Sequence, residues 1–122
     1  MPTDAEDLLR ANLQRVFNER DDTARAAAVA ELFVAEPVMY EPDAIVTGRA
    51  AICATAGALL ERFGPDFTFA PVAPAVGHYG MAALRWQAGP KGGAIAVTGT
   101  DVAEIADGRI VRLWVLLDPP AA

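Results

Sequence analysis

Cysteine, histidine and lysine each occur once in the 122 residues, as Cys53, His78 and Lys91. A single cysteine cannot close a disulfide within the chain, and one cysteine with one histidine supplies too few of the ligands that zinc prefers. We therefore expect no metal site. Cys53 lies in an alanine-rich apolar stretch and is expected to be a packing residue, and His78 is expected at a strand end.

Positive charge is also scarce and dispersed. Ten Lys and Arg residues stand against sixteen Asp and Glu, for a net charge of −6, and the arginines form no basic stripe. Proteins that bind nucleic acid or anionic membranes concentrate positive charge on one face, so we expect neither partner. The longest uncharged apolar run, Ala50–Leu60, is too short to span a bilayer, and the acidic start is unlike a signal peptide. A cytoplasmic protein is the expectation.

Apolar residues, in contrast, are abundant, at 53% of the chain, which is typical of a globular domain. The first half carries helical periodicity. The first helix has a capping box at its start, formed by Thr3 and Glu6. The apolar spacing predicts helices over about 4–20, 23–34 and 48–63.

The second half alternates between apolar and polar residues, as strands do. Gly and Pro clusters, and the turn sequence Ala106-Asp107-Gly108, separate these segments. This order predicts an α+β fold, a strongly bent antiparallel sheet wrapped by the three helices. We expect one domain over 1–118 with a short tail at 119–122. The predicted strands cover 37–42, 45–47, 67–69, 76–88, 94–105 and 109–117.

The predicted strand VTGTDVAEI, residues 97–105, carries a carboxylate on its apolar face. Burying the carboxylate of Asp101 is costly unless it is paired, hydrogen-bonded or protonated. Its neighbours on that face, Gly99 and Ala103, are small and leave room for a ligand, although Gly99 could instead mark a β-bulge. A pocket between sheet and helices is the expected ligand site.

A second carboxylate, Glu41, shares a strand face with Met39 and is predicted to face the same space. Two such carboxylates can have their pKa values driven apart and serve as general base and general acid. We therefore predict Asp101 and Glu41 as catalytic residues. Two alternatives stay open: Asp101 is a structural acid satisfied by Arg85, a tryptophan indole or water, and Glu41 is an exposed loop acid.

Apolar side chains on the first helix and on the inward strand positions are predicted to form the wall of this pocket. Trp114 has the opposite parity and is a candidate for a dimer face. The predicted substrate-binding residues are Leu13, Phe17, Met39, Leu84, Trp86, Leu113 and Leu117.

The sequence resembles the nuclear-transport-factor-2-like superfamily and, within it, the SnoaL-like group. The resemblance covers nearly the whole chain and is carried by ELFVAEPVMYEPDAIVTGRAAI and by the closing hairpin VTGTDVAEIADGRIVRLWVLLD. It implies a cone-shaped α+β barrel with a deep apolar pocket, commonly a homodimer through the outer sheet face. The fold hosts isomerases, cyclases, dehydratases, epoxide hydrolases and binders, so it does not fix the activity.

Three chemistries of related proteins can be compared with this chain. Similarity to ketosteroid isomerases places their general base on Glu41 and their oxyanion-hole acid on Asp101, but their oxyanion tyrosine falls on Leu13, which cannot donate. Limonene-type epoxide hydrolases need an Arg and a second Asp where this chain has Gly99 and Val115. SnoaL-like polyketide cyclases use one acid/base aspartate, which Asp101 matches.

Two hypotheses follow. In the first, the protein binds a small apolar, carbonyl-bearing molecule and catalyses aldol cyclisation or isomerisation through Asp101, without a cofactor, and Glu41 is a second acid/base or orients the substrate. In the second, it is a non-catalytic ligand-binding or dimerisation module in which Asp101 is structural. An Asp101 that points into a cavity near Glu41 favours the first hypothesis.

Overall fold

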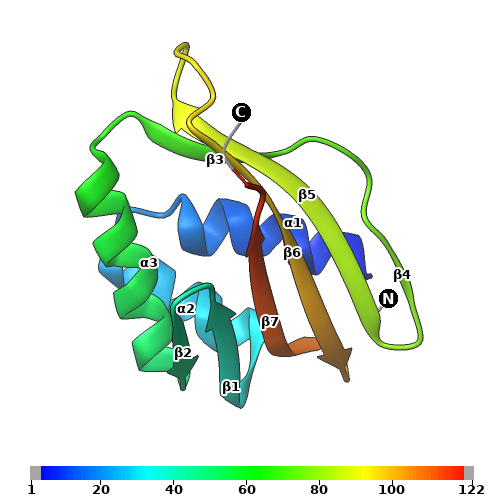
Figure 1. Ribbon diagram of the computed structural model, residues 1–122. Coiled ribbons are helices and arrows are strands. Elements are labelled where there is room, and N and C mark those ends of the chain that lie inside the picture. Colours follow the sequence, from blue (N-terminus) through cyan, green and yellow to red (C-terminus); the bar gives the residue numbers. More distant parts are fainter. Residues whose placement is uncertain (1–3, 120–122) are drawn as a thin grey trace.

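The computed structural model describes residues 4–119 as three helices on a curved, unclosed seven-stranded sheet (Figure 1). The predicted α+β fold is confirmed. The elements in chain order are α1 (Ala5–Asn12), the π-helical turn η1 (Leu13–Phe17), α2 (Asp22–Leu32), β1 (Phe33–Glu41), β2 (Ala44–Thr47), α3 (Arg49–Phe63), β3 (Phe67–Pro71), β4 (Val76–His78), β5 (Met81–Pro90), β6 (Val97–Ala106) and β7 (Arg109–Leu117).

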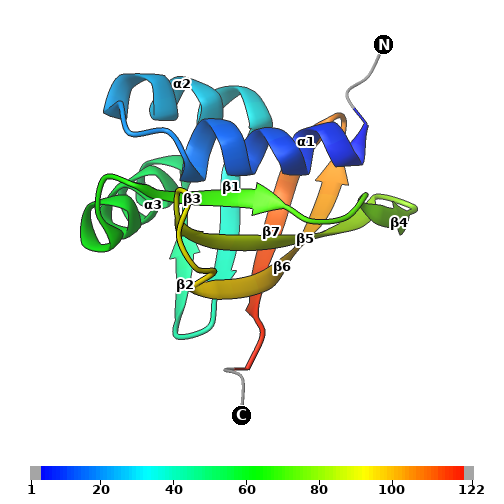
Figure 2. The same ribbon diagram turned by 90° about the horizontal axis from the view of Figure 1, so that it is seen from above.

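The strands lie in the order β2-β1-β7-β6-β5-β3, and the short β4 pairs with β5. All neighbouring pairs are antiparallel except β1 and β7, which run parallel. Figure 2 shows α1 and α2 over one face of the sheet, with α3 beside β1 and β2. Strand β6 is therefore central, with β5 and β7 on its two sides. None of the helices in residues 4–119 is long and apolar enough to cross a membrane.

The helix ends differ slightly from the sequence predictions. Asp4 caps α1, because its side chain accepts a hydrogen bond from the backbone N–H of Asp7 at 2.8 Å, whereas Thr3 lies outside the described residues. The second helix ends at Leu32, since Phe33 is extended and already pairs with Ile110 in the sheet. Helix α3 runs between two glycines as predicted.

The predicted strand over 76–88 is in fact a hairpin. Tyr79 and Gly80 both adopt positive φ, 52° and 82°, and turn the chain between β4 and β5. The predicted turn at Asp107 and Gly108 is confirmed, with φ of 53° and 75°, which is the conformation of the favoured two-residue hairpin loops. His78 ends β4 and is exposed, as expected.

The core lies between the helices and the concave face of the sheet. It is formed by the apolar side of α1 and η1, by α2, and by the inward residues of the central strands. Cys53 is half-buried on α3 and packs against this core, as predicted. On the outer face Trp114 stacks on Tyr40, with ring centres 5.1 Å apart.

One arginine ties the end of α3 to the start of the second half of the chain. Arg20 donates to the carbonyls of Leu60, Gly64 and Phe67 at 3.4, 2.7 and 3.0 Å. These carbonyls lie where α3 ends and β3 begins, so the contact fixes the angle between the two elements.

We expect Arg20→Met to lower the free energy of unfolding by about 1–2 kcal/mol, because the three carbonyls lose a charged donor. Urea denaturation measures the change. Arg15→Met is the matched control, since Arg15 only forms an exposed ion pair with Glu31, and exposed pairs contribute about 0–1 kcal/mol. Equal losses in the two variants would contradict this role for Arg20.

Candidate active site

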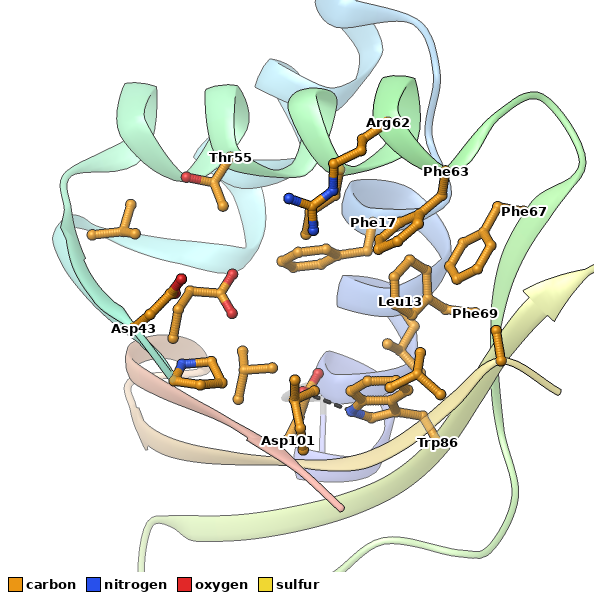
Figure 3. Close-up of a pocket in the computed structure, with 18 of the residues that line it drawn as sticks. Leu13, Phe17, Asp43, Thr55, Arg62, Phe63, Phe67, Phe69, Trp86 and Asp101 are labelled. Carbon is orange, nitrogen blue, oxygen red and sulfur yellow. Dashed lines mark hydrogen bonds between the residues drawn. The ribbon is translucent and has the colours of Figure 1, made fainter. Parts of the chain in front are cut away.

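A cavity of about 550 Å³ opens between the sheet, η1 and α3 (Figure 3). Most of its wall is apolar, and aromatic rings surround one end. It is lined by Leu13, Phe17, Glu41, Pro42, Asp43, Ala44, Val46, Thr55, Leu59, Arg62, Phe63, Phe67, Phe69, Trp86, Ala96, Val97, Asp101, Val115 and Leu117. Within residues 4–119 no three His, Cys, Asp or Glu side chains are grouped to hold a metal ion.

Asp101 lies in the floor of the cavity and is only 3% exposed. Its carboxyl Oδ1 accepts a hydrogen bond of 2.9 Å from the indole N–H of Trp86. In the sheet register Trp86 pairs with Gly99 and Leu84 pairs with Asp101, so Trp86 reaches Asp101 diagonally across neighbouring strands. No described residue donates a hydrogen bond to the other carboxyl oxygen, Oδ2.

Gly99 has a different role from the one its size suggested. A Cβ at this position would lie 2.5 Å from the carbonyl oxygen of Leu116 and 2.6 Å from Cζ2 of Trp86. The space beside Asp101 is therefore occupied by the Trp86 ring and not left for a ligand on this side. Because the ring lies across Gly99, its N–H is directed at the carboxyl group.

The environment of Asp101 changes its acidity. Burial raises the pKa of its carboxyl to about 7, helped by the charge of Glu41 and opposed by the hydrogen bond from Trp86. Partial burial also raises the pKa of Glu41, and the neighbouring Asp43 raises it further. Since desolvation disfavours the charged form of a carboxyl, Asp101 and Glu41 hold protons more tightly than acids in water.

Asn12 is a buried neighbour that the sequence prediction missed. Its amide lies close enough to Asp101 to lower the pKa of the carboxyl, but neither amide atom is placed for a hydrogen bond with any described residue. The missed signal is that Asn12 interrupts an apolar helical stripe, four residues after Leu8 and four before Val16. A buried, unpaired amide costs stability, about 1–3 kcal/mol.

The π-helical turn and β3 bring aromatic wall residues together. The backbone N–H of Asn18 donates to the carbonyl of Leu13, which closes the wide turn that points Leu13 and Phe17 at the cavity. The Asn18 side chain pairs with both backbone groups of Phe69, at 2.8 and 2.7 Å. This contact holds the Phe69 ring 6.0 Å from Phe17 and 5.4 Å from Trp86.

Six of the predicted site residues line the cavity: Leu13, Phe17, Glu41, Trp86, Asp101 and Leu117. The other three, Met39, Leu84 and Leu113, are fully buried in the core and do not line it. They share the inward parity of the strands, but helices α1 and α2 cover the part of the sheet where they lie. We therefore assign these three to the core and not to the pocket wall.

Several wall residues were not predicted. Phe67 and Phe69 lie in the strand predicted over 67–69, and both rings face the cavity. Asp43, Thr55 and Arg62 contribute its remaining polar groups. A turn acid and two polar residues on a helix are ordinary surface features, so the sequence gives no signal that they meet at one cavity.

Comparison with known proteins is consistent with this architecture. The SnoaL-like domain family matches residues 10–113. A proposed isomerase of the SnoaL-like family from Agrobacterium tumefaciens is 24% identical, with a TM-score of 0.84 over 92% of this chain and 95% of that chain.

Two further solved structures share the fold. A proposed polyketide cyclase from Sinorhizobium meliloti is 22% identical, with a TM-score of 0.69 over 89% of this chain and 93% of that chain. A proposed ketosteroid isomerase from Kribbella flavida is 19% identical, with a TM-score of 0.68 over 96% and 82% of the two chains. No curated protein gives a significant match.

We expect Gly99→Ala to destabilise the protein by about 1–3 kcal/mol, because the new methyl group meets a backbone carbonyl that cannot move and the Trp86 ring. The near-ultraviolet circular dichroism of the tryptophans should change with it. Gly93→Ala, in the loop after β5, is the control, since its Cβ would lie 3.3 Å from its nearest neighbour. A Gly99→Ala protein as stable as this control would disprove the close packing.

The pKa of Asp101 also predicts how stability depends on pH. The pKa of the carboxyl is about 7 in the folded protein, whereas an aspartic acid exposed to water has a pKa of 3.8. Between these values the folded state keeps a proton that the unfolded chain has lost, so this group makes stability fall as pH rises.

Asp101→Asn removes the titration and keeps an oxygen that can accept the Trp86 hydrogen bond. We expect it to raise the free energy of unfolding by on the order of 2–4 kcal/mol at about pH 8, and to change it little at about pH 4, where the aspartic acid is neutral. Urea denaturation at the two pH values measures both. A difference that is the same at both pH values would refute the raised pKa.

Proposed function

The chain belongs to the SnoaL-like domain family, and on that premise we propose that it binds a small apolar, carbonyl-bearing molecule in the cavity. We further propose that Asp101 transfers a proton to or from this molecule, in an aldol cyclisation or an isomerisation. The observation that carries the proposal is a buried carboxyl with one hydrogen-bond donor and a pKa of about 7, at the floor of an apolar cavity.

The local chemistry supports this role for Asp101. A general base works best when its pKa lies near the ambient pH, because it is then both ionised and basic enough to accept a proton. The Trp86 N–H fixes Oδ1, which leaves Oδ2 to face the ligand. We propose that Oδ2 takes the proton from a carbon next to the carbonyl group.

Glu41 is proposed as the second acid. Burial and Asp43 raise the pKa of its carboxyl, which favours the protonated form that can donate a hydrogen bond to a carbonyl oxygen. Leu13 lines the cavity, and the resemblance to ketosteroid isomerases places their oxyanion tyrosine at this position. We propose that Glu41 takes over part of the stabilisation of the developing negative charge.

A non-catalytic binding module is the alternative, and one contact favours it. The indole of Trp86 satisfies Oδ1 of Asp101, which is one of the structural roles considered from the sequence. In this case the cavity would hold an apolar metabolite without changing it, and Asp101 would only position Trp86.

Exchange of carbon-bound hydrogen for deuterium distinguishes a protein that catalyses proton transfer from one that only binds the ligand. 2-Tetralone has acidic protons next to its ketone, and their replacement by deuterium in D₂O can be followed by NMR. We expect the wild-type protein to accelerate this exchange and Asp101→Asn to reduce the protein-dependent rate by about 100-fold or more. Glu104→Gln is the control, because Glu104 lies on the same strand but pairs with Arg112 outside the cavity.

The dependence on pH tests the identity of the base. The ionised form of Asp101 accepts the proton and the protonated form of Glu41 acts as the second acid, so the rate should rise with pH up to about 7 and fall again at higher pH, where Glu41 loses its proton. Glutamine at position 41 is neutral and cannot lose a proton. Glu41→Gln should therefore remove the fall at high pH, and it should move the rise to lower pH, because the charge of Glu41 no longer raises the pKa of Asp101. Binding of 2-tetralone with no exchange above the buffer rate would exclude this proton transfer and favour the binding module.

A further inference from the structure

Arg62 reaches into the cavity from the last turn of α3. Figure 3 shows its guanidinium group in the space beside Phe17 and Phe63, on the opposite wall from Asp101. Its Cζ atom lies 5.0 Å from the centre of the Phe63 ring, a cation–π contact that holds the side chain against the aromatic wall. Among the described residues that line the cavity, Arg62 is the only lysine or arginine.

The usual structural task of such an arginine is performed by another residue. An arginine in the last turn commonly donates to the final carbonyls of its helix and offsets the helix dipole. Here Arg20 donates to the carbonyls of Leu60 and Gly64. Within residues 4–119, Arg62 forms neither a hydrogen bond nor a salt bridge, so its donors are not needed to hold the fold together.

The acids of the cavity do not neutralise Arg62 either. Glu41 and Asp43 line the same cavity, but neither forms an ion pair with Arg62 in the described part of the chain. The pKa of Glu41 is raised, whereas an arginine close to it would lower that value. The guanidinium group is therefore not neutralised by any described side chain, and because Arg62 is exposed at the rim of the cavity, its donors are hydrated and free to bind a ligand.

We propose that Arg62 binds a carboxylate on the ligand, at the end remote from the carbonyl group that faces Asp101. This inference rests on the proposed function and specifies its substrate class: an apolar keto-carboxylate and not a neutral ketone. The planar guanidinium group suits a carboxylate, since two parallel N–H groups can donate to its two oxygens. The Phe63 ring lies against the guanidinium group and holds it at the cavity, and the two polar ends of the ligand set its direction there.

The test compares two probes that differ in one charge. 6-Acetyl-2-naphthoic acid carries a ketone at one end of a flat apolar ring system and a carboxylate at the other, and its methyl ester is neutral. Isothermal titration calorimetry at neutral pH gives the dissociation constant of each probe for the wild type, Arg62→Gln and Arg62→Lys. Arg109→Gln is the matched control, because Arg109 is an exposed arginine at the start of β7 that does not line the cavity.

We expect the wild type to bind the acid about tenfold more tightly than the ester. Arg62→Gln should remove this preference by weakening only the acid, Arg62→Lys should keep part of it, and Arg109→Gln should leave it unchanged. Thermal denaturation confirms that the variants are folded.

The other outcomes are distinguishable. If the wild type binds acid and ester equally, or if Arg62→Gln weakens both alike, the carboxylate inference is wrong while binding of an apolar ketone stands. If neither probe binds to the folded wild type, the proposed ligand site and the inference built on it both fail.

Discussion

The hydrogen bond from Trp86 to Asp101 is the contact on which the geometry of the cavity depends. It links neighbouring strands diagonally and brings the Trp86 ring close to its sheet partner Gly99. Because Gly99 has no side chain, the ring can lie against the backbone and still direct its N–H at the carboxyl. The same ring forms part of the aromatic wall through its contact with Phe69. One packing arrangement thus sets the position of the acid and the shape of the space above it.

The polar groups around Asp101 are fewer than a buried carboxylate needs. Trp86 supplies one hydrogen bond, Asn12 lies near without forming one, and Glu41 adds a charge of the same sign. A carboxylate stabilised only for structure would normally be surrounded by donors. Burial with so few partners raises the pKa of the carboxyl to about 7, so both its protonated and its ionised forms are populated near neutral pH. This shortage of partners is typical of sites where a proton is exchanged.

Much of the fold and the two acids could be predicted from the sequence, because strand parity and helical periodicity are local patterns. Asp101 and Glu41 both line the cavity, as their parity indicated. The same parity could not separate Met39 and Leu113 from the wall, since which part of a sheet a helix covers depends on tertiary packing. Arg62 was missed for a related reason: an arginine on a helix becomes part of a site only through the elements that face it.

The carboxyl of Asp101 and the rest of the cavity wall come from different parts of the fold. The acid is held by β5 and β6 in the middle of the sheet, where each strand is paired on both sides. The remaining wall comes largely from η1, α3, β3 and the turn between β1 and β2, at the periphery of the fold. Substitutions in these peripheral elements would reshape the cavity without moving the carboxyl group. Under the proposed function, such a division would let selectivity for the ligand change during evolution while the proton-transferring group stays the same.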